Sequence, residues 1–141
     1  MGDSDLRIIV CLDDGGGMCF NKRRQSRDRA LLKDLKAYVD EDRLLCSAFS
    51  EKMLTEAGIA HEVSERFLEL AGEDDFCFVE CDGIAERADA VKEIVIYKWN
   101  RRYPSDVRFD CAPEKCGFKL AEVSEFAGSS HEKITREIYK R

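Results

Sequence analysis

The sequence lacks any long hydrophobic run, and this absence limits where the protein can act. No stretch of 18 apolar residues occurs, so we expect no membrane-spanning helix and no membrane partner. The apolar run Ile8–Leu12 is too short for a signal peptide, and acidic residues follow it directly. We therefore expect a cytoplasmic protein.

Histidine is scarce, and the cysteines are not spaced as metal ligands. His61 and His131 are the only two histidines, and the seven cysteines form no C-x-x-C pair. An odd number of cysteines without an export signal argues against a disulfide framework. The sequence predicts no metal site and names no cofactor, and it predicts that Cys11, Cys46 and Cys77 are small core residues on strands.

The length and composition fit one folded domain. The chain has 141 residues, of which 44% are hydrophobic and 37% charged, which suits a single core. The chain contains no internal repeat, so we expect one domain over residues 1–141. The oligomeric state does not follow from the sequence.

Charge is spread unevenly along the chain. The net charge is −6, yet residues 22–36 contain seven bases and two acids, whereas residues 40–93 contain 16 acids and five bases. Folding could place the basic segment beside Lys98, Arg101, Arg102 and Arg108, and such a patch would attract phosphates or RNA. The alternative is a solvated surface with local ion pairs.

Residues 6–34 form the stretch around which we expect the fold to be organised. Leu6–Leu12 predicts a buried strand, Asp13–Gly17 a loop, and Ser26 the N-cap of a helix whose apolar residues have helical spacing. A loop and a helix N-terminus at one end of a sheet favour the binding of anions.

Candidate ligand-binding residues follow the strand in this stretch. The glycines let a ligand approach the backbone closely, and the arginines offer forked donors to a phosphate or carboxylate. The glutamine can read a base edge or an amide. The alternative is a set of arginines that only decorate a helix start or pair with internal carboxylates. The predicted ligand-binding residues here are Gly15, Gly16, Gly17, Arg23, Arg24, Gln25, Ser26 and Arg27.

A second candidate cluster lies in the segment GSSHEKIT near the C-terminus. We predict that Ser129 and Ser130 contact the ligand and that His131 and Asp28 carry protons if the protein is catalytic. No G-x-S-x-G elbow is present, so the pattern does not predict a hydrolase triad. The alternative is a surface hairpin with hydrogen-bonded serines.

A third cluster, residues 97–103, interleaves aromatic and basic side chains. Single-stranded nucleic acid is bound by this combination, through stacking and phosphate contacts. The alternative is that Trp99 belongs to the core, which is the more common place for a tryptophan on an internal strand.

Hydrophobic patterning predicts the remaining elements. We expect strands at residues 43–48, 59–63, 76–79, 93–99, 107–109 and 118–123, and helical segments at 50–57, 64–70 and 84–91. Ser50 is the expected N-cap of the first of these helices. The tail at residues 132–140 fits either a helix or a strand, because Ile134 and Ile138 are four residues apart.

Taken in order, these segments resemble the dihydrofolate reductase family almost from end to end. Leu6–Asp13 followed by Gly17-Met18 is similar to the first strand and the G-I-G loop of that family. Residues 43–54 are similar to its second strand and capped helix, and residues 76–99 to its strand, helix and strand around the cofactor glycines. The resemblance implies an α/β fold with a central, mostly parallel sheet flanked by helices and an antiparallel C-terminal hairpin, which makes the tail a strand.

The family's functional motifs differ in this sequence. Glu80, Cys81 and Asp82 occupy the position of the Gly-Gly pair that receives the cofactor pyrophosphate, and acids there would repel a phosphate. Residues 47–50 lack the arginine for a 2′-phosphate, and residues 23–25 replace the L-P-W that packs the substrate. The resemblance therefore implies a reductase-like scaffold with altered or lost cofactor and folate sites.

The chain also resembles a small family of functionally uncharacterised proteins from anaerobic Gram-positive bacteria. The shared motifs are F-N-x-R-R-Q-S-R-D at residues 20–28, Y-K-W-N-R-x-Y-P at 97–104 and G-S-S-H-E-K-I-T at 128–135. Some members are labelled ribonuclease Z. Such enzymes need an H-x-H-x-D-H motif, and two histidines 70 residues apart cannot build that two-metal site.

Three functional hypotheses follow. The first is a binding protein or enzyme that acts on a nucleotide-like or other phosphorylated ligand through the arginine-rich site. The second is an RNA-interacting or regulatory module that uses the basic patch. The third is an NADPH-dependent reductase.

Overall fold

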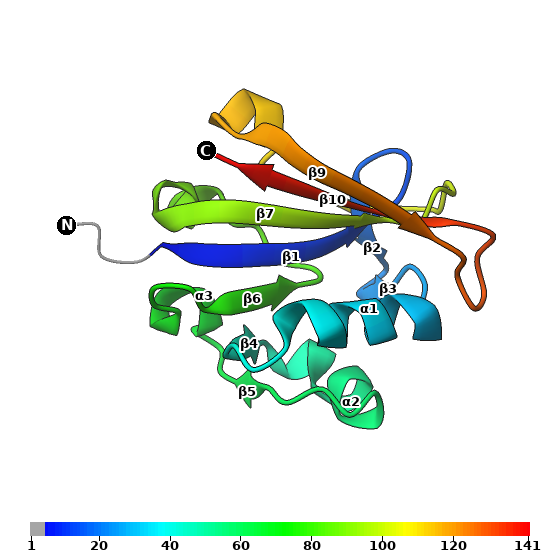
Figure 1. The fold of residues 1–141 in the computed structure, drawn as a ribbon, viewed down its shortest axis with the longest axis horizontal. Helices are drawn as coiled ribbons and strands as arrows, with labels where there is room; N and C mark the ends of the chain where they lie inside the picture. The colour runs from blue at the N-terminus through cyan, green and yellow to red at the C-terminus, as the bar shows by residue number, and fades with distance from the viewer. Residues whose placement is uncertain (1–4) are drawn as a thin grey trace.

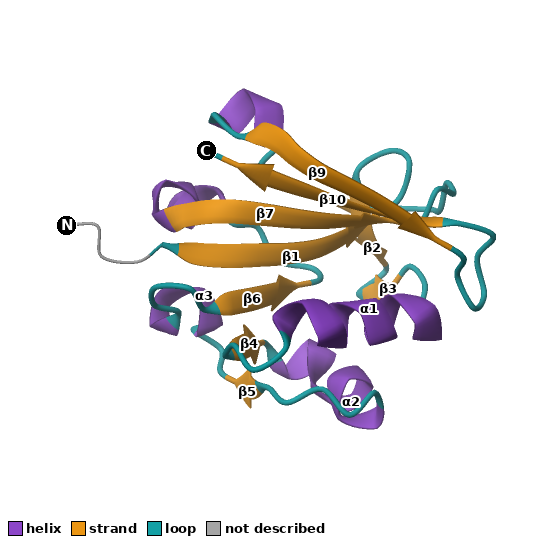
Figure 2. Cartoon of the chain, viewed as in Figure 1, coloured by secondary structure: helices purple, strands orange, loops and turns teal. Residues whose placement is uncertain are grey.

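The computed structural model describes residues 5–141, so the first four residues of the expected domain lie outside the described part of the chain. Within residues 5–141, a seven-stranded sheet has the order β5-β4-β6-β1-β7-β10-β9, and a small sheet has the order β3-β2-β8 (Figure 1). The strands are β1 (Leu6–Leu12), β2 (Gly17–Phe20), β3 (Arg23–Arg24), β4 (Leu44–Cys46), β5 (Glu62–Val63), β6 (Phe76–Val79), β7 (Val91–Lys98), β8 (Val107–Arg108), β9 (Lys119–Phe126) and β10 (Ile134–Lys140). The α-helices are α1 (Arg29–Val39), α2 (Ala48–Glu56) and α3 (Phe67–Leu70), and the 3₁₀ turns are η1 (Ala85–Ala90) and η2 (Pro113–Cys116) (Figure 2).

The direction of the strands confirms the predicted fold class. β1 is central and pairs in parallel with β6 and β7, and β4 continues the parallel part of the sheet between β6 and β5. β10 is antiparallel to both β7 and β9. The C-terminal tail is therefore a strand in an antiparallel hairpin, as the family resemblance implied.

Apolar side chains on both faces of the sheet create two core layers. Helices α1 and α2 cover one face, where Leu31, Leu35 and Leu54 pack on Ile9 and Phe78. Helix α3 and the turns η1 and η2 lie over the other face. Because β1 is covered on both sides, its sequence is a nearly continuous apolar run instead of an alternating one.

Helix α1 begins two residues later than predicted. Asp28, not Ser26, is its N-cap, and the Asp28 carboxylate accepts hydrogen bonds from the backbone N–H groups of Ala30 and Leu31. Serine and aspartate are both good N-caps, and the tertiary contacts of Asp28 described below decide between them.

Two further local predictions are corrected. Ser47 occupies the N-cap position of α2, and Ser50 lies inside that helix, where its hydroxyl donates to Glu80 at 2.7 Å. The expected helix at residues 84–91 is the 3₁₀ turn η1, and Val91 already belongs to β7. Cys46 and Cys77 are buried on strands, whereas Cys11 is only half-buried.

None of the helices within residues 5–141 is both long enough and apolar enough to cross a membrane.

Candidate functional site at the carboxyl edge of the sheet

Segments far apart in the sequence meet where the parallel strands end. β1, β6 and β7 finish at the same edge, and α1 starts there (Figure 1). The turn between β9 and β10 and the loop after β7 reach the same edge. In open α/β sheets, ligands bind outside the carboxyl ends of the strands.

Asp28 is the centre of the hydrogen bonds at this edge. In addition to capping α1, its carboxylate accepts the backbone N–H of Ser129 at 3.0 Å and that of Ser130 at 2.9 Å. The Nδ1 atom of His131 lies 3.0 Å from Asp28 Oδ2. Asp28 therefore joins the start of α1 to the turn between β9 and β10.

The environment of Asp28 keeps its carboxyl group ionised. Burial alone would raise its pKa, but the hydrogen bonds from Ser129, His131, Ser130 and Leu31 outweigh burial and hold the pKa of Asp28 well below its usual range. Since an ionised carboxylate can only accept, the Nδ1 atom of His131 is the donor.

His131 connects Asp28 to two hydroxyl groups. Its Nε2 atom lies 2.7 Å from the Tyr103 hydroxyl and 3.1 Å from Ser26 Oγ. The imidazole stacks on Trp99, with ring centroids 4.7 Å apart. Only 3% of the His131 side chain and none of the Asp28 side chain is exposed. With Nδ1 protonated, a neutral imidazole leaves Nε2 as an acceptor for one of the hydroxyls.

Gly128 permits the close approach of the turn to Asp28. A Cβ atom at this position would lie 2.7 Å from Asp28 Oδ2 and 2.7 Å from the carbonyl oxygen of His131. Any larger residue would therefore push the turn away from α1.

The structure brings together only part of the predicted set. Asp28, Ser26, Ser129, Ser130 and His131 form one cluster. Sequence reasoning missed Tyr103 and Trp99 as members of this cluster. The motif that contains both fits a nucleic-acid surface or, for Trp99, a place in the core, and only the folded register shows that their rings contact His131.

The three arginines expected to hold an anion do not converge. Arg24 is bound by Glu80, with Nε to Oε2 at 2.5 Å and a second bond at 2.7 Å, and only 8% of the Glu80 side chain is exposed. Arg27 pairs with Glu56 at the end of α2. Arg23 precedes Arg24 on β3, so its side chain points to the opposite face of that strand. Ligand binding by these arginines stays a prediction.

The glycine loop is closed on itself. Asp13 Oδ1 accepts the backbone N–H groups of Gly15 and Gly17 at 2.9 and 2.7 Å, and the Gly16 N–H donates to the Asp13 carbonyl. Asp13 Oδ2 accepts the N–H of Tyr103. These hydrogen bonds outweigh the effect of burial and lower the pKa of Asp13. Because the amides already have acceptors, the loop gives no anion cradle in this conformation.

Gln25 lies between the glycine loop and the loop after β7. Its Nε2 group donates to the carbonyl oxygen of Pro104 at 3.3 Å, while its buried Oε1 has no partner within the described residues.

An open depression of about 580 Å³ adjoins the Asp28–His131 pair. Trp99 and His131 contribute to its lining, and the cations Arg101 and Lys133 stand on its walls. The side-chain amide of Asn100 donates to the carbonyl oxygen of Lys133 at 3.1 Å, which links the loop after β7 to the residue before β10. We call this feature the edge depression. It is lined by Trp99, Asn100, Arg101, Ser130, His131, Glu132 and Lys133.

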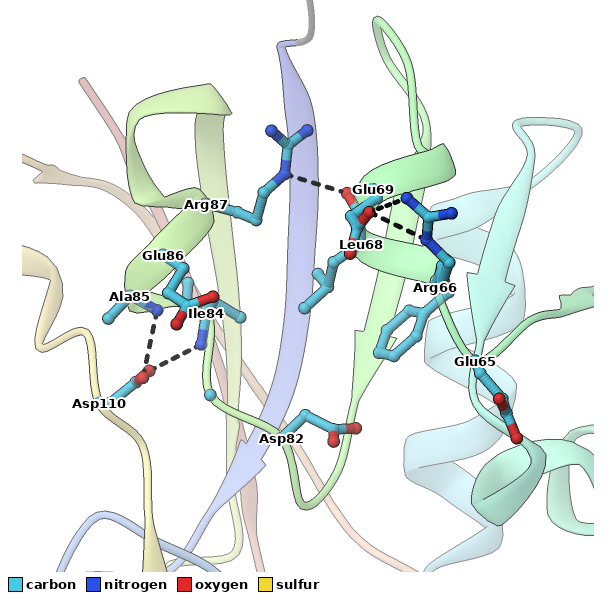
Figure 3. A pocket seen from close by; sticks show the side chains of 12 residues that line it. Glu65, Arg66, Leu68, Glu69, Asp82, Ile84, Ala85, Glu86, Arg87 and Asp110 are labelled. Atoms are coloured by element: carbon cyan, nitrogen blue, oxygen red, sulfur yellow. Dashed lines mark hydrogen bonds and ion pairs between the residues drawn. The ribbon is translucent and has the colours of Figure 1, made fainter.

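A second open pocket, of about 680 Å³, lies between α3, the loop after β6 and η1 (Figure 3). Its two cations are engaged: Arg66 pairs with Glu69, and Arg87 donates to the carbonyl oxygen of Leu68. Asp110 accepts the N–H groups at the start of η1. Because the lining holds more acids than bases, it is unsuited to a phosphate. The acids are Glu65, Glu69, Asp82, Glu86 and Asp110.

Among residues 5–141, no three histidine, cysteine, aspartate or glutamate side chains are grouped as a metal site.

Comparison with known proteins identifies the fold. The structure is similar to dihydrofolate reductase from Enterococcus faecalis, solved in complex with NADP(H) and RAB-propyl, with a TM-score of 0.65 and 10% sequence identity over 97% of this chain and 96% of that chain. No family model and no curated protein matches the sequence. The chain therefore has a dihydrofolate reductase-like fold, and its activity must be inferred from its own residues.

The residues after β6 are acidic, and little space is left beside them. Glu80 is buried against Arg24 and Ser50, and Asp82 lies on the acidic pocket. The space between α1, β1 and β6 is nearly filled, with only about 10 Å³ left beside the Arg24–Glu80 pair. A pyrophosphate next to these acids would meet repulsion.

Proposed function

We propose that this protein binds a small phosphorylated, nucleotide-like ligand in the edge depression. The observation that carries the proposal is that Arg101 and Lys133 both line an open hollow at the carboxyl ends of parallel strands. Two cations that line one hollow can contact the same phosphate group.

The local charges support an anionic ligand. Within the lining, Arg101 and Lys133 are opposed by one carboxylate, Glu132, and Arg102 is next in the chain. Lys133 has an exposed partner, Glu125, at 3.3 Å. An exposed ion pair of this kind contributes at most about 1 kcal/mol, so a phosphate can displace it.

Trp99 allows a direct test, because it is the only tryptophan in the chain and it lines the depression. We expect pyrophosphate and ADP to change its fluorescence with saturation, and adenosine to have no effect. Arg101→Ala and Lys133→Ala should each weaken binding at least tenfold. Lys52→Ala, an exposed cation on α2, is the matched control and should bind normally.

The proposal fails if neither phosphate compound changes the fluorescence or raises the melting temperature. A response confined to single-stranded RNA, steeply dependent on salt and lost in Arg101→Ala, would replace it with the RNA-binding alternative.

The reductase alternative rests on the NADP(H) complex of the structural neighbour. The same titration with NADPH tests it. If NADPH binds and the Lys133→Ala variant binds it equally well, the cofactor occupies another site and the reductase hypothesis gains support. We expect no such binding, because Glu80 and Asp82 stand where the loop after β6 would meet the pyrophosphate.

A further inference from the structure

We propose that Ser26, His131 and Asp28 form a nucleophilic centre that hydrolyses carboxylic esters, with Ser26 as the nucleophile and His131 as the general base. Ser26 Oγ lies 3.1 Å from His131 Nε2, and His131 Nδ1 lies 3.0 Å from Asp28 Oδ2. A hydroxyl, an imidazole and a carboxylate in this order are the arrangement that activates serine on several unrelated folds.

The two buried groups are held in the orientation that the reaction needs. Asp28 is fixed by the amides of α1 and of the turn between β9 and β10. The imidazole of His131 is fixed by its stack on Trp99. Asp28 therefore acts as a positioning residue, because it keeps the proton on Nδ1 and leaves Nε2 as the base.

The need to cap α1 does not explain the contact between Ser26 Oγ and His131 Nε2. The helix start is already satisfied by Asp28, and the Ala30 N–H has a second acceptor in Ser129 Oγ. Ser26 is half-buried, whereas Asp28 and His131 are almost fully buried. Of the three residues, Ser26 is thus the one with the most solvent access.

Tyr103 supplies a donor beside the nucleophile. Its hydroxyl lies 3.3 Å from Ser26 Oγ and 2.7 Å from His131 Nε2. When Ser26 donates to Nε2, the Tyr103 hydroxyl donates to Ser26 Oγ, and from there it can turn to donate to the oxygen that becomes negatively charged next to Ser26. Side-chain hydroxyls serve as such donors in other acyl-transfer sites.

The reaction balances without another reactant except water. Ser26 Oγ attacks the ester carbonyl carbon while its proton moves to His131 Nε2. The bond from that carbon to the alcohol oxygen then breaks, and the alcohol leaves with the proton from Nε2. Water attacks the acyl-serine and gives a proton to Nε2, the Ser26 ester bond breaks, and Oγ takes the proton back. The products are the carboxylic acid and the alcohol.

The probe is 4-nitrophenyl acetate, which carries no phosphate, so the result does not depend on ligand binding in the edge depression. Seven cysteines and His61 give this reagent a background rate. The informative comparison is therefore between Ser26→Ala and the control Ser124→Ala, a half-buried serine on β9. We expect steady turnover to fall at least 100-fold in Ser26→Ala and to stay normal in Ser124→Ala, with both variants folded.

A covalent label and a positioning variant complete the test. Phenylmethanesulfonyl fluoride should add one sulfonyl group to the wild-type peptide that contains Ser26, as seen by mass spectrometry. Asp28→Asn should lower kcat at least 100-fold with little change in KM, because an amide in place of the carboxylate favours the wrong tautomer of His131. The proposal is overturned if wild-type turnover equals that of Ser26→Ala, or if the sulfonyl group is found only on other peptides.

Discussion

Replacing Asp28 with alanine should destabilise the protein more than any other single acid-to-alanine change at the carboxyl edge. The N-cap bonds contribute about 1 kcal/mol. Hydrogen bonds from Ser129 and Ser130 to a charged acceptor contribute about 1.5 kcal/mol each at the low end of the usual range. Together these give about 4 kcal/mol, in line with the cost of truncating one partner of a buried pair.

Urea denaturation followed by circular dichroism measures this loss. With about 3 °C of melting temperature for each kcal/mol in a chain of this size, Asp28→Ala should melt about 12 °C lower than the wild type. Asp28→Asn keeps an acceptor for the α1 amides and should lose less. Asp14→Ala, an exposed acid in the neighbouring loop, is the control and should change stability by less than about 0.5 kcal/mol.

The reasoning is refuted if Asp28→Ala costs less than about 1 kcal/mol, a value that the N-cap alone would explain. It is also refuted if Asp14→Ala costs as much as Asp28→Ala, since the effect would then reflect net charge and not the buried network.

Three other outcomes follow from the structure. Arg24→Met should lower the free energy of unfolding in urea by about 3 kcal/mol, because it leaves the Glu80 carboxylate buried and unpaired. The double variant Arg24→Met, Glu80→Leu should recover most of this loss. No recovery would mean that the ion pair itself stabilises the fold. Gly17→Ala should cost about 2 kcal/mol by calorimetry, since its Cβ would lie 2.4 Å from Ser105 Oγ, and adding Ser105→Gly should relieve the clash. The pKa of Asp28 is lower in the folded state than in the unfolded chain, so its contribution to stability is complete above the unfolded value of about 4 and is lost as the pH falls toward the folded value. The melting temperature of Asp28→Ala should therefore depend less on pH below 4 than that of the wild type.

Local patterns predicted most of the framework. The apolar runs at residues 6–12, interrupted only by Arg7, and at residues 76–79 correspond to β1 and β6, because strands buried on both faces carry few polar residues. The boundaries of α1 and α2 were less accurate. Each helix start offers two good capping residues within a few positions, and the choice depends on partners that are distant in the sequence.

The candidate site was predictable only in part, for a physical reason. Basic residues followed by a cap indicated the edge of the sheet where Asp28 and His131 meet, and both residues were among the predicted site residues. The contact of Ser26 with His131 joins residues 105 positions apart, and that of Arg24 with Glu80 joins residues 56 apart. Such pairings depend on strand order and register, which local sequence does not encode.

The most direct test of the central claim is a map of backbone amide shifts by NMR while pyrophosphate is added to the wild-type protein. The account predicts saturable shifts concentrated in residues 99–103 and 130–133, and their loss in the Arg101→Ala, Lys133→Ala double variant. Saturable shifts centred on residues 15–17 or 23–27, or no shifts at all, would contradict it.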